Sequence, residues 1–458
     1  MQAGPDVDVL EAAAHSAIEY ARSIAARRIT PDEDALVALA AFDEPLPDVG
    51  ADPVATLRLL DDVGSPATIA SSGARYFGFV TGAVYPVALG TSWLASAWDQ
   101  NAGLSVMSPV ATKLHDVVRR WLVDLLGLPA DTGLAFVTGA TVANSACLAA
   151  ARDSLLATLG WDVQSDGLFG APPLDVVVGE GAHSTLKKSL GLVGLGRRRV
   201  HVVPADDQGR LRADLLPDLD GPVLICAQAG EVNTGAFDPF DEIADWLAQR
   251  TGWLHVDAAF GLWALADPSR ADLVRGLPRA DSWATDGHKW LNVTYDCGLA
   301  FVRHIDDLRR TFTATAGYLP GDETFEAMHH TPQSSQRARQ LEVWAVLRTL
   351  GRKGIAALVD GNCRAAASIA ERLRDEGLTI LNDVVLNQVL VRDVDGPTTE
   401  ALIEAVQADG RVWCGPTQWG GATAMRISVS SWRTDLEVAT FTADVIIESS
   451  RQVTASQA

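Results

Sequence analysis

The chain has 458 residues, of which 48% are hydrophobic and 21% charged, and its formal net charge at pH 7 is −21. This length indicates a large domain with smaller additions, and the composition is typical of a globular protein. The negative charge disfavours nucleic acid, and no apolar run is long enough to cross a bilayer, so neither nucleic acid nor a membrane is an expected partner.

The first 28 residues lack the basic start and apolar block of an export signal, so we expect the protein to stay in the cytoplasm. The five cysteines are scattered, without a CxxC pair or a spacing suited to metal ligands. We therefore predict reduced packing thiols and no metal site.

The first two thirds of the chain are predicted to alternate between helix and strand. Residues 6–28 and 86–127 are predicted helices, and the second should end where Gly and Pro occur in "LLGLPADTG". Seven short apolar or β-branched runs follow, which indicates a largely parallel sheet covered by helices. These runs are residues 134–137, 175–179, 199–203, 223–227, 253–257, 281–285 and 298–302.

The last third has a different pattern. Two helices broken at a glycine are followed by "TILNDVVLNQVLVRD", a helix around 398–408 and "AMRISVSSW". This mixture of helices and short strands predicts a separate, small α+β domain at the C-terminus.

The segment "FVTGATVANSACLAAAR" (136–152) indicates a strand, a turn of small residues and an Ala-rich helix. Gly139, Ala140 and Thr141 leave backbone N–H groups free at the start of this helix, where the helix dipole favours an anion. A turn of small residues is equally compatible with close packing alone. The sequence has no GxGxxG and no GxxxxGK[ST] motif, which argues against a dinucleotide or a triphosphate.

Two charged residues follow predicted strands. Asp257 ends the run "WLHVD", and a carboxylate there needs a cation such as a protonated heterocyclic nitrogen, unless it only caps the next turn. Lys289 lies in "TDGHKWLN", between an imidazole and an indole, and such crowding favours the neutral amine that attacks carbonyls. A phosphate site, an acid and an amine are together the three contacts that pyridoxal 5'-phosphate (PLP) requires.

At these residues the sequence resembles the group II PLP-dependent amino-acid decarboxylases, which include the aromatic-amino-acid, tyrosine, histidine and glutamate enzymes. The resemblance covers roughly residues 70–350 and continues more loosely to the end. The segments that carry it are "RYFGFVTGAVYP", "SPVATKLHDVVRRWLVDLLGLP", "FVTGATVANSACLAAAR", "GEGAHSTLKKS", "AGEVNTGAFDP", "WLHVDAAFG", "DGHKWLNVTYDCG" and "QRARQLEVWAVLRTLG".

The resemblance implies an α/β architecture, the type I (aspartate aminotransferase-like) PLP fold, with a seven-stranded mainly parallel sheet and a smaller α+β C-terminal domain. We expect an N-terminal helical arm at 1–70, a large PLP-binding domain at 71–335 and the small domain at 336–458. The resemblance also implies a homodimer with the active site at the subunit interface.

Three catalytic residues are implied by the resemblance. Lys289 would bind PLP as a Schiff base, Asp257 would keep the pyridine nitrogen protonated, and His183 would stack on the ring. Taken alone, a histidine at the start of a helix is more often a capping or packing residue.

The other implied cofactor contacts surround the phosphate. His288 precedes the lysine as in the family, and Asp286 stands where many members have Asn or another polar residue. The full set of implied cofactor-binding residues is Gly139, Ala140, Thr141, His183, Asp257, Ala259, Asp286, His288 and Lys289.

The implied reaction is decarboxylation of an L-amino acid to an amine and carbon dioxide. Decarboxylation-coupled oxidative deamination, aldol-type carbon–carbon cleavage and transamination are alternative PLP reactions. A non-catalytic relative is a third possibility, against which the presence of both Lys289 and Asp257 argues.

The residues that would select the substrate are ambiguous in the sequence. Glu231 could favour a cationic substrate or face solvent, and Arg426 could bind a carboxylate or be structural. By resemblance four aromatic residues line the substrate entrance, although core or dimer-interface positions explain them equally well: Tyr76, Phe79, Trp93 and Trp98.

The segment before the "RARQLEVW" helix departs from the family. Members commonly carry a tyrosine there that returns a proton to Cα, whereas "GDETFEAMHHTPQSSQ" (321–336) contains none. Tyr318, His329 or His330 could take this role, or slow protonation could let an intermediate react with oxygen to give an aldehyde. Adjacent histidines on a loop are more often simply solvated.

Overall fold

The computed structural model describes residues 7–314, 325–393 and 396–457. Its centre is a seven-stranded sheet in the order β1-β7-β6-β5-β4-β2-β3, in which β7 runs antiparallel to both neighbours and the other pairs are parallel. All seven predicted strands are present. They are β1 (Gly133–Val137), β2 (Asp175–Gly179), β3 (His201–Val203), β4 (Val223–Gln228), β5 (Gly252–Asp257), β6 (Ser282–Asp286) and β7 (Gly298–Val302).

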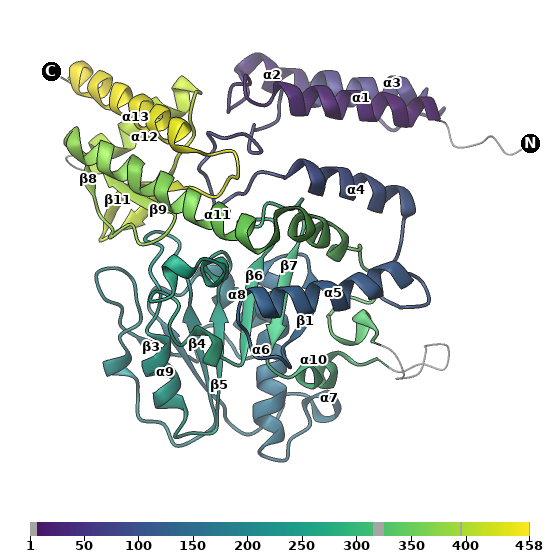
Figure 1. The fold of residues 1–458 in the computed structure, drawn as a ribbon, viewed down its shortest axis with the longest axis vertical. Helices are drawn as coiled ribbons and strands as arrows, with labels where there is room; N and C mark the ends of the chain where they lie inside the picture. The colour runs from purple at the N-terminus through teal and green to yellow at the C-terminus, as the bar shows by residue number, and fades with distance from the viewer. Residues whose placement is uncertain (1–6, 315–324, 394–395, 458) are drawn as a thin grey trace, which may run out of the picture.

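Helices cover both faces of this sheet (Figure 1). One buried cluster joins the sheet to α6 (Ala140–Ala157), α8 (Ser184–Leu192) and α10 (Ile305–Phe312). Another joins it to α4 (Pro86–Trp98), α5 (Pro109–Leu125), α9 (Phe240–Leu247) and the first part of α11 (Gln340–Asp375). A short helix, α7 (Val163–Asp166), follows α6.

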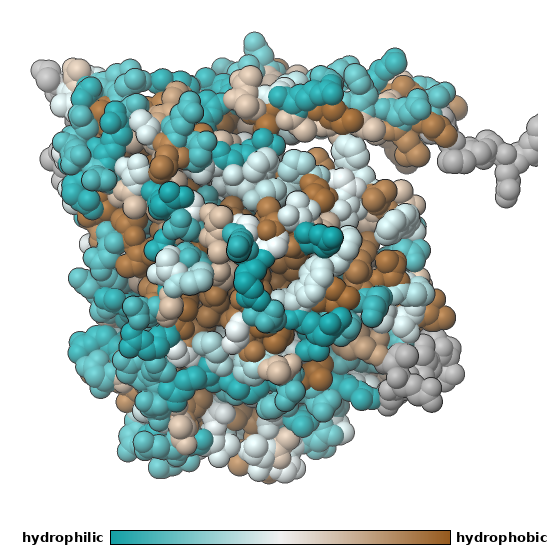
Figure 2. Space-filling view, viewed as in Figure 1, coloured by the Kyte–Doolittle hydropathy of each residue, from teal (hydrophilic) through white to brown (hydrophobic). Residues whose placement is uncertain are grey.

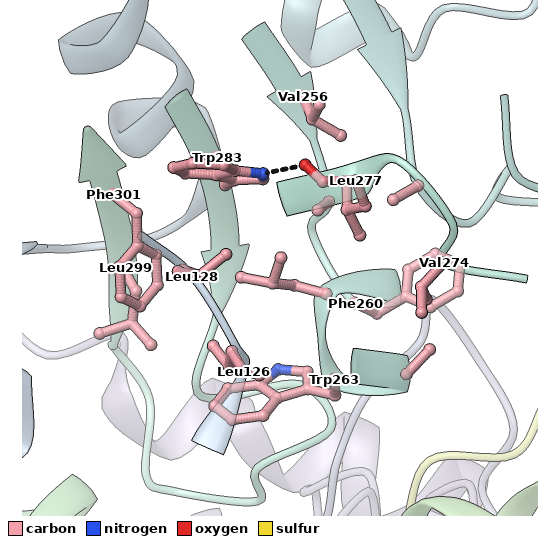
Figure 3. Close-up of a cluster of buried hydrophobic side chains, with 14 of the residues drawn as sticks. Leu126, Leu128, Val256, Phe260, Trp263, Val274, Leu277, Trp283, Leu299 and Phe301 are labelled. Atoms are coloured by element: carbon pink, nitrogen blue, oxygen red, sulfur yellow. Dashed lines mark hydrogen bonds between the residues drawn. The ribbon is translucent and has the colours of Figure 1, made fainter. Parts of the chain in front are cut away.

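The second of these clusters contains large aromatic residues behind the strands (Figure 3). Trp263, Trp283 and Phe301 are almost completely buried, and the Trp283 indole donates a 3.0 Å hydrogen bond to the Leu277 carbonyl. Burying each such side chain stabilises the fold by several kcal/mol, roughly 25 cal/mol for each Å² of apolar surface. This packing fixes the positions of the strand ends.

The C-terminal part contains a four-stranded antiparallel sheet in the order β10-β11-β9-β8. Its strands are β8 (Thr379–Ile380), β9 (Gln388–Arg392), β10 (Gly415–Trp419) and β11 (Ala422–Ser428). The second part of α11 packs with α12 (Gly396–Asp409) and α13 (Leu436–Gln457), and α11 kinks at Gly351, the predicted break. The long final helix α13 was not predicted.

The N-terminal helices lie along the top of the molecule in Figure 1, apart from the large sheet. They are α1 (Val7–Ser23), α2 (Glu33–Ala38) and α3 (Pro53–Leu59), and none of them contains a fully buried residue. Figure 2 shows apolar side chains gathered along the lower edge of this arm. Within the ranges that the structure describes, no helix is long and apolar enough to cross a membrane.

The predicted single helix at 86–127 is wrong, because two helices, α4 and α5, occupy this stretch. Asp99 adopts a left-handed conformation (φ 47°) that ends α4, and Pro109 begins α5. A proline fixes its own backbone and lacks an N–H, so it fits the first turn of a helix and disrupts the interior. The predicted domain boundaries stay a prediction.

Candidate active site

A cavity of about 230 Å³ lies where the parallel strands end at their carboxyl edge, the usual ligand-binding edge of an open α/β sheet. Its lining includes all nine residues of the predicted cofactor set, brought together from the ends of β1, β5 and β6 and from the start of α8. Five further lining residues were not predicted as cofactor contacts: Thr185, Gln228, Gly230, Val232 and Phe260.

One end of the cavity is the N-terminus of α6. Ala140 is the first residue of this helix, so its N–H group has no partner within the helix and faces the cavity wall. The backbone is closely packed here, since a Cβ atom added to Gly298 would lie 2.5 Å from Gly139 Cα. Glycine at position 298 lets β7 approach the turn, and the N–H groups at this helix start, among them that of Ala140, are donors for an anion.

Asp257 lines the same cavity and is 4% exposed. One carboxylate oxygen accepts a 3.3 Å hydrogen bond from the N–H of Ala259, and the nearby Asn144 amide favours the charged form of the acid. Burial raises the pKa of Asp257, and the positive charges of His183 and Lys289 oppose this shift. A buried carboxylate of this kind is stabilised by a cation within the cavity, as a protonated pyridine nitrogen would be.

Behind Asp257, a chain of buried polar groups fixes the position of its amide partner. Asn144 Oδ1 lies 2.8 Å from His255 Nε2, and His255 Nδ1 lies 2.9 Å from Ser282 Oγ. Burial lowers the pKa of His255 to about 3, so this imidazole is neutral and donates from only one of its nitrogens. Asn144 was missed from the sequence because nothing in its Ala-rich helix marks it as a contact of a residue 113 positions away.

His183 is a capping residue that also lines the cavity, and its stacking on the cofactor ring stays a prediction. It is the N-cap of α8, where Nδ1 accepts a 3.3 Å hydrogen bond from the N–H of Thr185 and lies 2.7 Å from the Thr185 hydroxyl. Its ring also lines the cavity. Burial lowers the pKa of His183, and the charges of Lys289 and Arg426 add to this effect while Asp257 opposes it. The cap therefore holds a largely neutral, flat ring against the cavity.

Lys289 is 3.1 Å from Asp286, measured from Nζ to Oδ2. The other oxygen, Oδ1, accepts a 2.6 Å hydrogen bond from the N–H of Ala140 and lies 3.5 Å from His288 Nε2. His288 Nδ1 accepts a 3.0 Å hydrogen bond from the N–H of Cys297, which leaves Nε2 to carry the proton of the neutral ring. Burial lowers the pKa of His288.

The crowding around Lys289 differs from the expectation. The Trp290 indole does not line the cavity but packs in the core and donates a 2.9 Å hydrogen bond to Asn362. The backbone of Lys289 is confined instead by Gly82, where an added Cβ would lie 1.8 Å from the Lys289 carbonyl oxygen. Lys289 is thus fixed from its backbone, while its side chain faces the cavity.

Tyr295 is a further neighbour of the site that the sequence reasoning missed. Its ring centroid lies 4.3 Å from that of His288, although 62% of the residue remains exposed. Partial burial raises the pKa of Tyr295. The only sequence signal was its place six residues after Lys289.

Glu231 neither faces solvent nor offers a free charge to a substrate. It is 4% exposed, and one oxygen accepts hydrogen bonds from the N–H groups of Asn233 (2.6 Å) and Thr234 (2.8 Å). Its neighbour Val232 lines the cavity instead. Arg426, from β11, donates a 3.4 Å hydrogen bond to the Val232 carbonyl, and its charge acts on His183.

The four aromatic residues predicted near the substrate entrance do not line the cavity. Tyr76 and Phe79 stack on Trp413, with ring centroids 5.0 and 5.6 Å apart. Trp93 and Trp98 lie on α4 and are 38% and 48% exposed.

His329 and His330 also lie away from the cavity lining, and both are 6% exposed, which contradicts a solvated pair. The His330 ring stacks on Phe325 (4.4 Å), which stacks in turn on His115 (4.2 Å). Tyr318 is outside the described residues.

The cavity fits PLP by the chemistry of its donors. The start of α6 offers donors for a phosphate, Asp257 supplies a buried acid that would pair with a protonated ring nitrogen, and Lys289 offers an amine. Because these three contacts come from separate elements, their meeting in one cavity supports a PLP site more strongly than any one of them alone.

Comparison with known proteins agrees with this site. Residues 70–392 match the family model described as the pyridoxal-dependent decarboxylase conserved domain. The chain is 27% identical over 355 residues to human acidic amino acid decarboxylase GADL1, covering 74% of this chain and 67% of the relative. It is 31% identical over 370 residues to L-2,4-diaminobutyrate decarboxylase of Rhizobium meliloti (strain 1021), covering 77% and 71%.

The fold agrees as well. The crystal structure of Oryza sativa TDC with PLP and tryptamine superposes with a TM-score of 0.89 at 22% identity over 99% of both chains. This similarity confirms the predicted fold class, and the family match confirms PLP as the cofactor and amino-acid decarboxylation as the reaction class. The chain belongs to the pyridoxal-dependent decarboxylase family.

Proposed function

We propose that this chain decarboxylates an L-amino acid to the corresponding amine and carbon dioxide, with Lys289, Asp257 and His183 as its catalytic residues. The observation that carries this proposal is the single cavity in which the phosphate site, the buried acid and the amine meet. PLP, when bound, supplies the electron sink that accepts the electron pair left by the departing carboxylate.

The proposed role of each residue follows from its surroundings. Lys289 holds the cofactor covalently and is exchanged for the substrate amine. Asp257, supported by Asn144, keeps the ring nitrogen charged, and the neutral imidazole of His183 packs against the ring face. We assign the substrate carboxylate to Arg426, which bonds to the carbonyl of the cavity-lining residue Val232 and whose charge acts on His183.

The segment 321–336 lacks the tyrosine that commonly returns a proton to the substrate in this family. His329 and His330 are buried and do not line the cavity, and His330 stacks on Phe325, so neither is placed to return the proton. Decarboxylation coupled to oxidative deamination is therefore the second candidate function, since a slowly protonated carbanion reacts with oxygen.

One assay tests both functions. Carbon dioxide release is measured over a panel of L-amino acids, with amine, aldehyde and keto acid quantified in the same reactions. Amine equal to carbon dioxide supports the decarboxylase, whereas aldehyde with oxygen consumption supports the second candidate. Keto acid formed without carbon dioxide would contradict both.

We further propose a homodimer with the active site at its interface. Trp93, Leu94 and Trp98 are exposed on α4, and a space of about 610 Å³ with a mainly apolar lining lies between α1 and the start of α4. Exposed apolar surface of this extent marks a protein contact.

We also propose the domain boundaries at 70 and 335 and a cytoplasmic location. We propose no nucleic-acid partner, because the formal charge of the chain is −21.

A further inference from the structure

The carboxylate of Asp286 lies at the anion site of α6. Its Oδ1 accepts the hydrogen bond of the Ala140 N–H at 2.6 Å, and its side chain lines the cavity with 4% of its surface exposed. This N–H is one of the donors that a cofactor phosphate would use in the proposed function. The Asp286 carboxylate and a cofactor phosphate thus require the same donor, the Ala140 N–H.

The same carboxylate also holds the amine. Oδ2 lies 3.1 Å from Lys289 Nζ, so Asp286 bridges the phosphate end of the site and the lysine. Asp257, the other buried acid of the cavity, bonds instead to the Ala259 N–H. The two acids therefore differ in position although they carry the same charge.

Only the side chain of Asp286 is able to move aside. Its backbone N–H donates to the Ala259 carbonyl at 2.9 Å, its carbonyl accepts from the Trp263 indole at 3.3 Å, and it pairs with Gly298 in the sheet. Space beside it is limited, since a Cβ added to Gly139 would lie 3.4 Å from Oδ1. A phosphate that enters must rotate the carboxylate away from α6.

We propose that Asp286 occupies the phosphate end of the cofactor site in the cofactor-free enzyme and must leave it when PLP binds. Its carboxylate therefore lowers the affinity of the site for ligands that carry a phosphate. This inference rests on the proposed function. Two anions at one helix N-terminus repel each other, so the carboxylate lowers phosphate affinity even after it has rotated. Displacing it also frees Lys289 for the cofactor aldehyde.

The test compares three ligands on the cofactor-free protein: PLP, pyridoxal, which lacks the phosphate, and inorganic phosphate. Dissociation constants are measured by absorbance titration for the first two and by calorimetry for the third. We expect Asp286→Asn to bind PLP and inorganic phosphate about tenfold more tightly, the effect of removing one repulsive charged contact. Its affinity for pyridoxal should change much less.

Asp257→Asn is the matched control, because it removes the same charge from the same cavity without touching the Ala140 N–H. Its ratio of PLP to pyridoxal affinity and its phosphate affinity should change much less than those of Asp286→Asn. If Asp286→Asn folds poorly, Asp286→Ser keeps an uncharged acceptor beside Ala140 and should show the same gain.

The inference is overturned if Asp286→Asn and Asp286→Ser bind phosphate no more tightly than the wild type, or lose PLP and pyridoxal affinity in parallel. The failure of the proposed function looks different. In that case the wild type binds neither PLP nor pyridoxal at Lys289, and the inference falls with it.

Discussion

At the scale of single residues, Asp257 carries the clearest prediction. Asp257→Asn should still bind PLP, because a charge-assisted hydrogen bond contributes only about 1.5–3 kcal/mol. Turnover should fall by about 10²–10³, since an uncharged ring withdraws electrons poorly. Absorbance titration separates binding from steady-state turnover.

Asp267 is a suitable control for Asp257. It is also buried, at 5% exposed, but it accepts hydrogen bonds from Ser269 and does not line the cavity. Asp267→Asn should lower stability and leave the turnover of the folded fraction unchanged. Near-normal turnover in Asp257→Asn would exclude the proposed role of that acid.

Asp238 predicts a specific dependence of stability on pH. Burial raises the pKa of Asp238 to about 7, with the nearby charges of Asp206 and Glu231 adding to the shift and the N–H groups of Leu211 and Gln228 opposing it. Its unfolded value is about 3.9. The folded state therefore binds this proton more tightly, and the stabilisation is complete below about pH 4 and is lost as the pH rises through about 7.

The measurement for Asp238 is urea unfolding at pH 5 and pH 8. In the wild type this group should contribute about 2 kcal/mol more to the free energy of unfolding at the lower pH. Asp238→Asn cannot titrate, so the free energy of unfolding of the wild type should fall relative to that of the variant, by about 2 kcal/mol, between pH 5 and pH 8. A difference that is the same at both pH values would argue against a protonated Asp238.

At the scale of elements, the close approach of the Gly82 segment to the turn after β6 is predicted to be essential. Gly82→Ala puts a Cβ 1.8 Å from the Lys289 carbonyl oxygen, a contact with backbone that no side-chain rotation relieves. We expect a loss of about 1–3 kcal/mol in stability and weaker PLP binding, because Lys289 is displaced. Chemical denaturation and cofactor titration measure the two effects.

Gly361 provides the opposite case for comparison. It lies inside α11, and nothing is within 4 Å of an added Cβ. Gly361→Ala should stabilise the protein by about 0.5–1 kcal/mol, because alanine loses less backbone entropy in a helix. Equal effects of the two substitutions would mean that the contact with Lys289 is not a structural constraint.

The sequence predicted the elements of the large sheet well and their long-range contacts poorly. The seven strands are short apolar runs, a local signal, and Asp257 and Lys289 follow two of them. The break between α4 and α5 had a local signal in Pro109 that the helix prediction did not use. The contact between Asp286 and Ala140 joins positions 146 residues apart and depends on tertiary packing alone.

At the scale of the whole molecule, the proposed dimer predicts different effects for two exposed aromatic residues. Trp98 on α4 is 48% exposed, and Phe169, on a loop, is 100% exposed. A tryptophan at the centre of an interface contributes about 2 kcal/mol or more, so Trp98→Asp should weaken the dimer by about thirtyfold or more. Light scattering coupled to size exclusion should then detect monomer.

Phe169→Asp should keep the mass of the wild type, because that residue lies away from α4. Both variants should retain the circular dichroism of the folded protein. A wild type that is monomeric at micromolar concentration, or a Trp98→Asp variant that stays dimeric, would contradict the proposed interface on α4.

The most direct test of the whole account is borohydride reduction of the PLP-loaded enzyme, followed by peptide mapping. The chain has only five lysines, at 113, 187, 188, 289 and 353, so the labelled position is unambiguous. We predict one cofactor per chain, bound at Lys289, and loss of both the label and carbon dioxide release in Lys289→Ala. A label at any of the other four lysines, or full activity in Lys289→Ala, would contradict the assignment of this cavity as the active site.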